Sequence, residues 1–150
     1  MRRGTAARRG THLTTVAGWM ALSYGAAHVV VVPLRRRKDL SEAWADGWWN
    51  AFTLDEPTTS AEAERALTFW QTLGSFGVPM LMLGGHLVWS AHQGRRVPAW
   101  LGGMMLAWGL PFVTALPKSP GWALPVIGGL IVAGDTGGPS RPEPVASDEA

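Results

Sequence analysis

The 150-residue sequence has no cysteine, a single tyrosine and few charged residues. Without cysteine, the chain forms no disulfide, has no thiol nucleophile and builds no cysteine-ligated metal site. Charge is also missing from long parts of the chain, since no Asp, Glu, Lys or Arg occurs in residues 10–34, 66–94, 97–117 or 119–134. The first absence excludes several chemistries, and the second indicates the fold class.

The four charge-free runs have the composition of membrane-spanning segments. A hydrocarbon core about 30 Å thick is crossed by roughly 20 apolar helical residues, and a helix satisfies its own backbone hydrogen bonds in lipid. We therefore expect an all-α fold, a four-helix transmembrane bundle within residues 13–134, with helices over about 13–33, 66–91, 98–116 and 121–134. The last run is the shortest and covers only about 24 Å as a helix.

The two ends of the chain differ in composition. Residues 1–12 are rich in Arg, and a basic start before an apolar run also occurs in signal peptides, for which Gly25-Ala26-Ala27 offers a cleavage site. Because apolar sequence continues to Leu34, a retained first span is the preferred interpretation. Residues 135–150 are rich in Gly, Pro, Ser and acids and are expected to be disordered.

Basic residues near the helix ends predict orientation. Four of them flank each end of the first helix, which therefore gives no preference. Arg95 and Arg96 follow the second helix, whereas Lys118 alone follows the third. This difference favours a multi-pass protein of the inner (plasma) membrane with both termini in the cytoplasm.

An aromatic stripe separates the first two expected spans. In residues 39–52, Leu40, Trp44, Trp48 and Phe52 recur every four residues, and Trp49 adjoins them. This helical period predicts an amphipathic segment lying in the membrane interface. A helix packed across the mouth of the bundle would bury the same stripe, so both interpretations stay open.

The second expected span has clear start and depth signals. Thr59-Ser60-Ala61-Glu62 fits a capping box, in which the Thr and Glu side chains satisfy the opening amides of a helix. Trp70 and Trp89 would be about 28 Å apart along one helix, which matches the spacing of the two membrane interfaces that Trp prefers.

Polar side chains within the spans are the candidate functional residues, because they are costly in lipid. Helical rise places His28 and Gln71 on the same side of the membrane, so we expect a polar cluster of Tyr24, His28 and Gln71, with His86 as a further candidate ligand-binding residue. His86 would lie about 18 Å from His28, too far for the two to share a haem iron. No catalytic residue, cofactor or metal is expected, and the lack of an intramembrane carboxylate or amine argues against proton-coupled pumps and exporters.

Several short motifs resemble those of an uncharacterised family of small bacterial four-span membrane proteins, known as a domain of unknown function. The motifs are Gly18-Trp19, Gly25-Ala-Ala-His28, Phe69-Trp70 followed by Gly74, and Pro117-Lys-Ser-Pro-Gly-Trp122. The likeness covers about residues 16–134 and implies four helices without assigned chemistry. The chain departs from the family by a longer, Trp-rich first loop and by Pro120.

These features predict a non-enzymatic membrane protein that binds a lipid-like small molecule or a membrane partner. The expected partners are the lipid bilayer and either a membrane protein or a second copy of the chain. Nucleic acid is excluded because no continuous basic face is present. The alternative is a membrane-embedded redox or isomerase-type enzyme using His28 and Tyr24, since His transfers protons near neutral pH. A small transporter is the third and weakest hypothesis.

Overall fold

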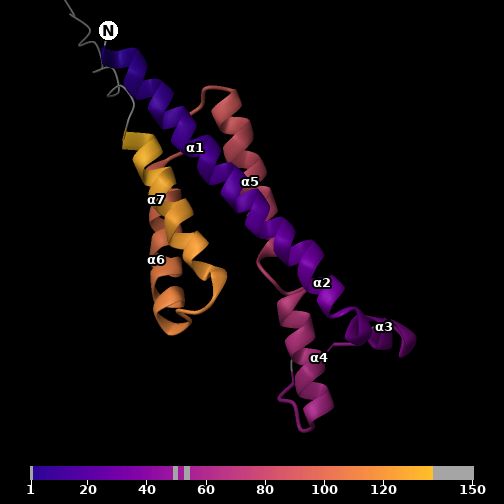
Figure 1. Ribbon diagram of the computed structural model, residues 1–150. Coiled ribbons are helices and arrows are strands. Elements are labelled where there is room, and N and C mark those ends of the chain that lie inside the picture. Colours follow the sequence, from indigo (N-terminus) through magenta and orange to yellow (C-terminus); the bar gives the residue numbers. More distant parts are fainter. Residues whose placement is uncertain (1, 49–50, 53–54, 137–150) are drawn as a thin grey trace, which may run out of the picture. The chain divides into compact units, whose positions relative to one another are not determined.

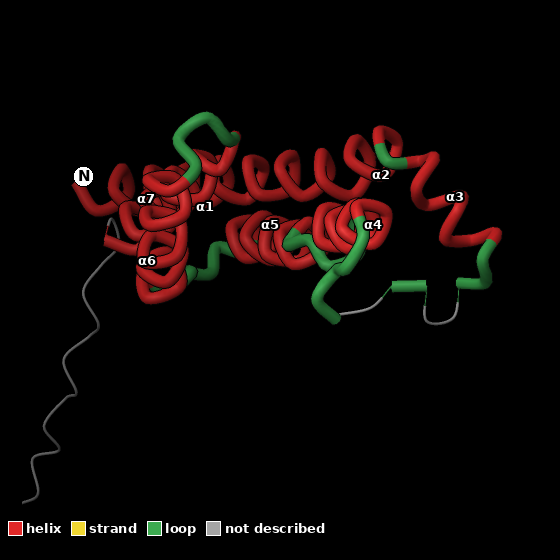
Figure 2. Tube along the Cα trace, turned by 90° about the horizontal axis from the view of Figure 1, so that it is seen from below, coloured by secondary structure: helices red, strands yellow, loops and turns green. Residues whose placement is uncertain are grey.

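The protein is described from a computed structural model over residues 2–48, 51–52 and 55–136. Every regular element in these ranges is helical (Figures 1 and 2), which confirms the all-α class. The helices divide into two compact units, one over residues 17–89 and the other over residues 1–16 and 90–150.

The first expected helix is longer than the sequence indicated. Helix α1 (Arg2–Ala26), the π-helical turn η1 (Ala27–Val31) and α2 (Val32–Arg35) follow one another directly, so the helix already begins within the basic N-terminal segment. Its part Arg8–Arg35 has 28 residues and, among the described helices, is the one long and apolar enough to cross a membrane. A buried core helix or an N-terminal signal sequence meets the same criterion, so this finding alone does not establish a span.

The expected helix over residues 66–91 is divided in two. Helix α4 (Ser60–Gln71) ends in turns at 72–76, and α5 (Gly77–His92) begins after them. Pro79 lies in the first turn of α5, where the missing amide needs no intrahelical partner, so it starts a helix instead of kinking one. Trp70 and Trp89 therefore lie on different helices, and a spacing calculated along one helix does not apply to them.

The capping box at the start of α4 is confirmed. The Glu62 amide donates to the Thr59 hydroxyl at 3.2 Å, and the Glu62 carboxylate accepts from the Thr59 amide at 3.2 Å. Two of the opening donors of the helix are thus satisfied by side chains.

The expected amphipathic segment over residues 39–52 is helical only in its first part. Helix α3 (Arg37–Ala45) ends before Gly47, which has a φ of 89°, a conformation that glycine adopts without a Cβ clash. Trp48 and Phe52 follow in the turn and loop, and Trp49 lies outside the described residues.

Glycine allows α1 and α5 to pack closely within the 17–89 unit (Figure 1). A Cβ placed on Gly84 would lie 2.7 Å from the Gly18 carbonyl oxygen, and one on Gly25 would lie 2.7 Å from the Gly77 carbonyl oxygen. Both distances are shorter than any side chain tolerates, so the two backbones touch. Because Gly18 meets Gly84 and Gly25 meets Gly77, the helices run antiparallel.

A helical hairpin forms most of the other unit. Helix α6 (Ala99–Ala115) and α7 (Ala123–Thr136) match the expected helices over 98–116 and 121–134, and the short 3₁₀ turn η2 (Pro120–Trp122) joins them. The hairpin contains a second close glycine contact, because a Cβ on Gly128 would lie 2.8 Å from the Gly102 carbonyl oxygen. Helix α7 includes Asp135, the first residue of the tail expected to be disordered, and residues 137–150 lie outside the described part.

Candidate functional site

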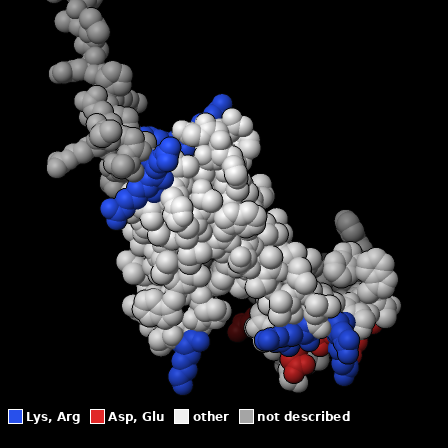
Figure 3. Space-filling model, turned by 45° about the horizontal axis from the view of Figure 1, so that its top comes forward, with Lys and Arg blue, Asp and Glu red and all other residues white. Residues whose placement is uncertain are grey.

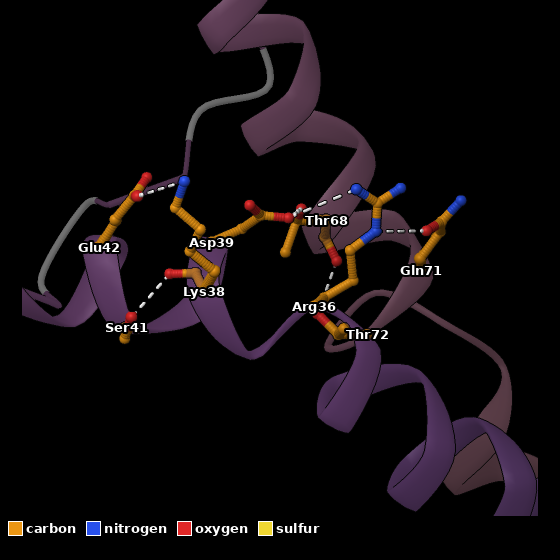
Figure 4. A network of polar contacts seen from close by, with 8 residues as sticks. All are labelled: Arg36, Lys38, Asp39, Ser41, Glu42, Thr68, Gln71 and Thr72. Carbon is orange, nitrogen blue, oxygen red and sulfur yellow. Dashed lines mark hydrogen bonds and ion pairs between the residues drawn. The ribbon is translucent and has the colours of Figure 1, made fainter.

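A network of polar side chains joins the corner between α2 and α3 to α4 in the 17–89 unit (Figure 4). Arg36 lies at that corner, where its φ of −97° and ψ of 17° end one helix and begin the next. Its Nε donates to Gln71 Oε1 at 3.0 Å, and its Nη1 lies 3.4 Å from Asp39 Oδ2. The guanidinium is therefore held from two sides.

Asp39 also connects to the buried side of the network. The Thr68 hydroxyl, which is fully buried, donates to Asp39 Oδ2 at 3.1 Å. The Thr72 hydroxyl donates to the Thr68 carbonyl oxygen at 2.6 Å, one helical turn earlier. The Arg36 and Asp39 side chains are 29% and 30% exposed, so the pair is neither buried nor freely solvated.

Around the network, basic and acidic side chains gather at the α3–α4 end of the 17–89 unit (Figure 3). Lys38 pairs with Glu42 at 3.9 Å, and Arg65 pairs with Asp46 at 2.7 Å. Arg35 and Arg37 make no side-chain ion pair or hydrogen bond within the part of the chain that the structure describes. The corner therefore keeps two uncompensated positive charges beside Arg36.

Five aromatic rings form a continuous row from α3 through the loop to α4. We call this row, Trp44–Trp48–Phe52–Phe69–Trp70, the aromatic chain. Its successive ring centroids are 5.6, 5.7, 5.4 and 5.3 Å apart, within the range of favourable aromatic pairs. Trp44 is nevertheless 70% exposed. The row thus combines mutual ring contact with a large uncovered apolar surface.

A second ring cluster lies where α4 ends and α5 begins. The His28 ring centroid is 4.8 Å from that of Tyr24 and 4.7 Å from that of Phe76, and the Tyr24 and Phe76 rings stack at 5.7 Å. His28 Nδ1 lies 3.1 Å from the Tyr24 carbonyl oxygen, which leaves Nε2 as the ring nitrogen turned away from its own backbone. His28 belongs to the π-helical turn η1, a feature that is frequent at functional sites.

A family model matches residues 12–137 of the chain, and its description is a family of unknown function, DUF6463. The chain belongs to this family. Comparison with curated proteins and with solved structures gives no match. The resemblance to an uncharacterised family is therefore confirmed, whereas the family description contains neither four spans nor a bacterial source. No chemistry comes with DUF6463, so the function has to be argued from the geometry.

The structure brings together only part of the polar cluster expected for this DUF6463 member. Tyr24 and His28 are in contact, but Gln71 is bonded to Arg36 and not to His28. His86 lies apart on α5, with its ring 6.0 Å from that of Trp89. Within the described residues no group of three or more His, Asp or Glu side chains is arranged to hold a metal ion.

Three residues of the side-chain clusters were not identified from the sequence: Arg36, Thr68 and Phe76. Arg36 belongs to a run of four basic residues that was interpreted only as a flank of the first helix. Phe76 lies in a segment that was expected to be helical throughout, and Thr68 resembles many other threonines in apolar sequence. For Phe76, the available signal was the cluster of Gly74, Ser75 and Gly77 around it, since such residues commonly interrupt helices.

Proposed function

We propose that the protein is a multi-pass integral membrane protein without enzymatic activity, which binds a lipid-like molecule along the aromatic chain. In this proposal, each of the four charge-free runs crosses the membrane and both termini lie in the cytoplasm. The observation that carries the proposal is the row of five rings, which is continuous while its three Trp side chains remain exposed.

The exposed surface supports a lipid environment. Large apolar side chains are exposed in both units, for example Met82, which is 72% exposed, and Trp100, which is 63% exposed. Proteins in water rarely expose apolar patches beyond a few hundred Å². Hydrocarbon chains would cover such a surface without the free-energy cost that water imposes.

The helix contacts also favour a membrane. Helices in lipid associate through close packing of small residues, because burial of apolar surface provides no driving force there. The Gly18–Gly84 and Gly25–Gly77 contacts in one unit and the Gly102–Gly128 contact in the other are of this kind. The helices α5, α6 and α7 have 16, 17 and 14 residues, or about 21–26 Å, so the bilayer would thin around them.

The topology is tested with single introduced cysteines. Because the natural chain has no cysteine, a thiol reagent labels only the introduced residue. Glu56→Cys and Lys118→Cys are expected to react with a membrane-impermeant maleimide added outside intact cells. Gln93→Cys is expected to react only after the membrane is permeabilised. Labelling of all three from outside would contradict the orientation, and labelling of none before lysis would contradict the multi-pass arrangement.

Ligand binding is tested by counting the lipids that remain on the purified protein, using mass spectrometry. Replacing Trp44 and Trp48 together by Ala removes two exposed rings whose apolar surface a bound lipid would cover, worth about 1 kcal/mol or more each, so we expect roughly a tenfold loss of retained lipid or more. Trp19→Ala with Trp100→Ala is the matched control, because both of these residues are exposed and neither belongs to the aromatic chain. Equal loss in the two double variants would contradict the proposal.

A second candidate function rests on the Tyr24–His28–Phe76 cluster. Its basis is the π-helical turn that carries His28 into ring contact with Tyr24, since His is a proton-transfer group near neutral pH. A redox or isomerase-type membrane enzyme would use this pair. An absorption spectrum of the detergent-purified protein tests the cofactor-dependent form, and a spectrum without haem or flavin bands would remove it.

A further inference from the structure

We infer that the corner between α2 and α3 is a headgroup site for an anionic phospholipid, in which Arg36 binds the phosphate. This inference rests on the proposed lipid-binding function and specifies its ligand. The inference is based on two neighbouring features of the 17–89 unit. Arg36 is held against Gln71 at the end of α4, and the exposed Trp70 ring lies on that helix beside Gln71.

Arg36 is oriented before any ligand arrives. Gln71 fixes its Nε and Asp39 fixes its Nη1, so the side chain has already lost most of its rotational freedom. In Figure 4 no interaction is drawn to its second terminal nitrogen. No described residue accepts a hydrogen bond from it. An arginine in this state binds a phosphate oxygen at low additional entropy cost, and its planar fork suits phosphate geometry.

The surrounding charge selects an anion. Arg35 and Arg37 flank Arg36 and have no side-chain partner among the described residues, whereas Asp39 compensates only Arg36. Each basic residue near an anionic membrane surface contributes about 1 kcal/mol of attraction, or about a fivefold change in affinity. A zwitterionic headgroup carries its own ammonium and gains much less from this cluster.

The apolar surface beside the corner matches the rest of a phospholipid. Trp70 directly precedes Gln71 on α4 and is 58% exposed, and Leu34, two residues before Arg36, is 64% exposed. Tryptophan rings prefer the level of the membrane interface, where headgroup and acyl chains meet. A free phosphate would use only the basic side chains, whereas a lipid uses both these and the apolar side chains.

The test measures headgroup selection in nanodiscs that contain equal parts of phosphatidylglycerol and phosphatidylcholine. After extraction, native mass spectrometry gives the ratio of the two lipids retained by the full chain, and we expect phosphatidylglycerol to be enriched. Arg36→Gln should reduce that enrichment about tenfold or more, since a charge-assisted hydrogen bond is lost together with the charge. Lys118→Gln removes the same charge outside the corner and should reduce it by less than about twofold.

Asp39→Asn provides a readout that misfolding cannot imitate. An asparagine oxygen in the same place can still accept from Thr68 and from Arg36 Nη1, so the arginine stays oriented while the competing negative charge is removed. Enrichment of phosphatidylglycerol should therefore rise several-fold, whereas a disrupted site would lose it. Inorganic phosphate at equal concentration should not displace the lipid.

Three outcomes would overturn the headgroup site: no enrichment in the wild type, equal effects of Arg36→Gln and Lys118→Gln, or displacement by inorganic phosphate. In each case the lipid-binding function still stands if Trp44→Ala with Trp48→Ala lowers total lipid retention. Failure of the tryptophan variants, with the lipid ratio unaffected, would instead refute the proposed function. The two proposals therefore fail separately.

Discussion

Two adjacent glycines of α5 should respond in opposite directions to the same substitution. A Cβ on Gly84 would lie 2.6 Å from the Leu22 amide nitrogen and 2.7 Å from the Gly18 carbonyl oxygen. Ordinary contacts begin at 3.4 Å, so α1 and α5 must separate by about 0.7–0.8 Å to accept an alanine there. Around Gly85, by contrast, no heavy atom beyond its chain neighbours and its own helix backbone lies within 4 Å of the same added Cβ.

The magnitude follows from two opposing terms. Forced separation of a well-packed contact costs about 1–3 kcal/mol, because a gap of this size loses roughly a quarter to a half of each dispersion contact. Alanine in place of glycine favours the helix by about 1 kcal/mol. We therefore expect Gly84→Ala to destabilise the fold by up to about 2 kcal/mol and Gly85→Ala to stabilise it by about 1 kcal/mol.

The difference can be measured by titrating the detergent-solubilised protein with SDS and following helix content by circular dichroism. The two variants have identical composition, so effects on detergent binding or on the unfolded chain cancel between them. Equal unfolding midpoints for Gly84→Ala and Gly85→Ala would refute the α1–α5 contact. The hairpin offers an independent repeat, with Gly102→Ala at a contact and Gly103→Ala in open space.

Three further predictions concern hydrogen bonds. The backbone N–H and the hydroxyl of Thr58 lower the pKa of Glu62 below its ordinary 4.5. The contribution of the ionised Glu62 carboxylate to the cap of α4 should therefore be complete above pH 4.5 and be lost as the pH falls through the lowered pKa. Faster amide hydrogen exchange in the first turn of α4 would report this loss. Asp135→Ala removes the acceptor of the first α6 amide, which donates to it at 2.9 Å, and should cost about 1 kcal/mol of unfolding free energy. Thr68→Val leaves the shape of the buried side chain but removes its hydrogen bond to Asp39, and should cost about 1–2 kcal/mol in the same SDS titration.

The helices were predictable where charge and local capping define their ends. The expected helix over 98–116 coincides with α6 to within one residue at each end, because Pro98 precedes it and a Pro-rich turn follows. The capping box of α4 was equally visible, since it depends on two side chains three residues apart. The division between α4 and α5 was missed because the charge-free run 66–94 continues through it, and only Gly74, Ser75 and Gly77 marked the interruption.

The candidate site was predictable only in part, because it depends on which helices meet. The Trp44, Trp48 and Phe52 spacing identified three rings of the aromatic chain, whose continuation through Phe69 and Trp70 depends on the fold of the loop. The Tyr24–His28 contact follows from a four-residue spacing on one helix. Gln71 was assigned to His28 by counting helical rise from the middle of an unbroken helix, and the break invalidates that count.

The break between α4 and α5 also explains how the Arg36 network reaches its partner. From Gly25 to Arg36 the chain advances 11 residues, or about 16 Å of helix, whereas their partners Gly77 and Gln71 are only 6 residues apart. Six residues in one unbroken helix would advance about 9 Å, so Gln71 would fall short of Arg36. The turns at 72–76 allow the chain to advance further per residue than a helix does. The same turns place Phe76 against His28, which makes the break the common cause of both side-chain clusters in this unit.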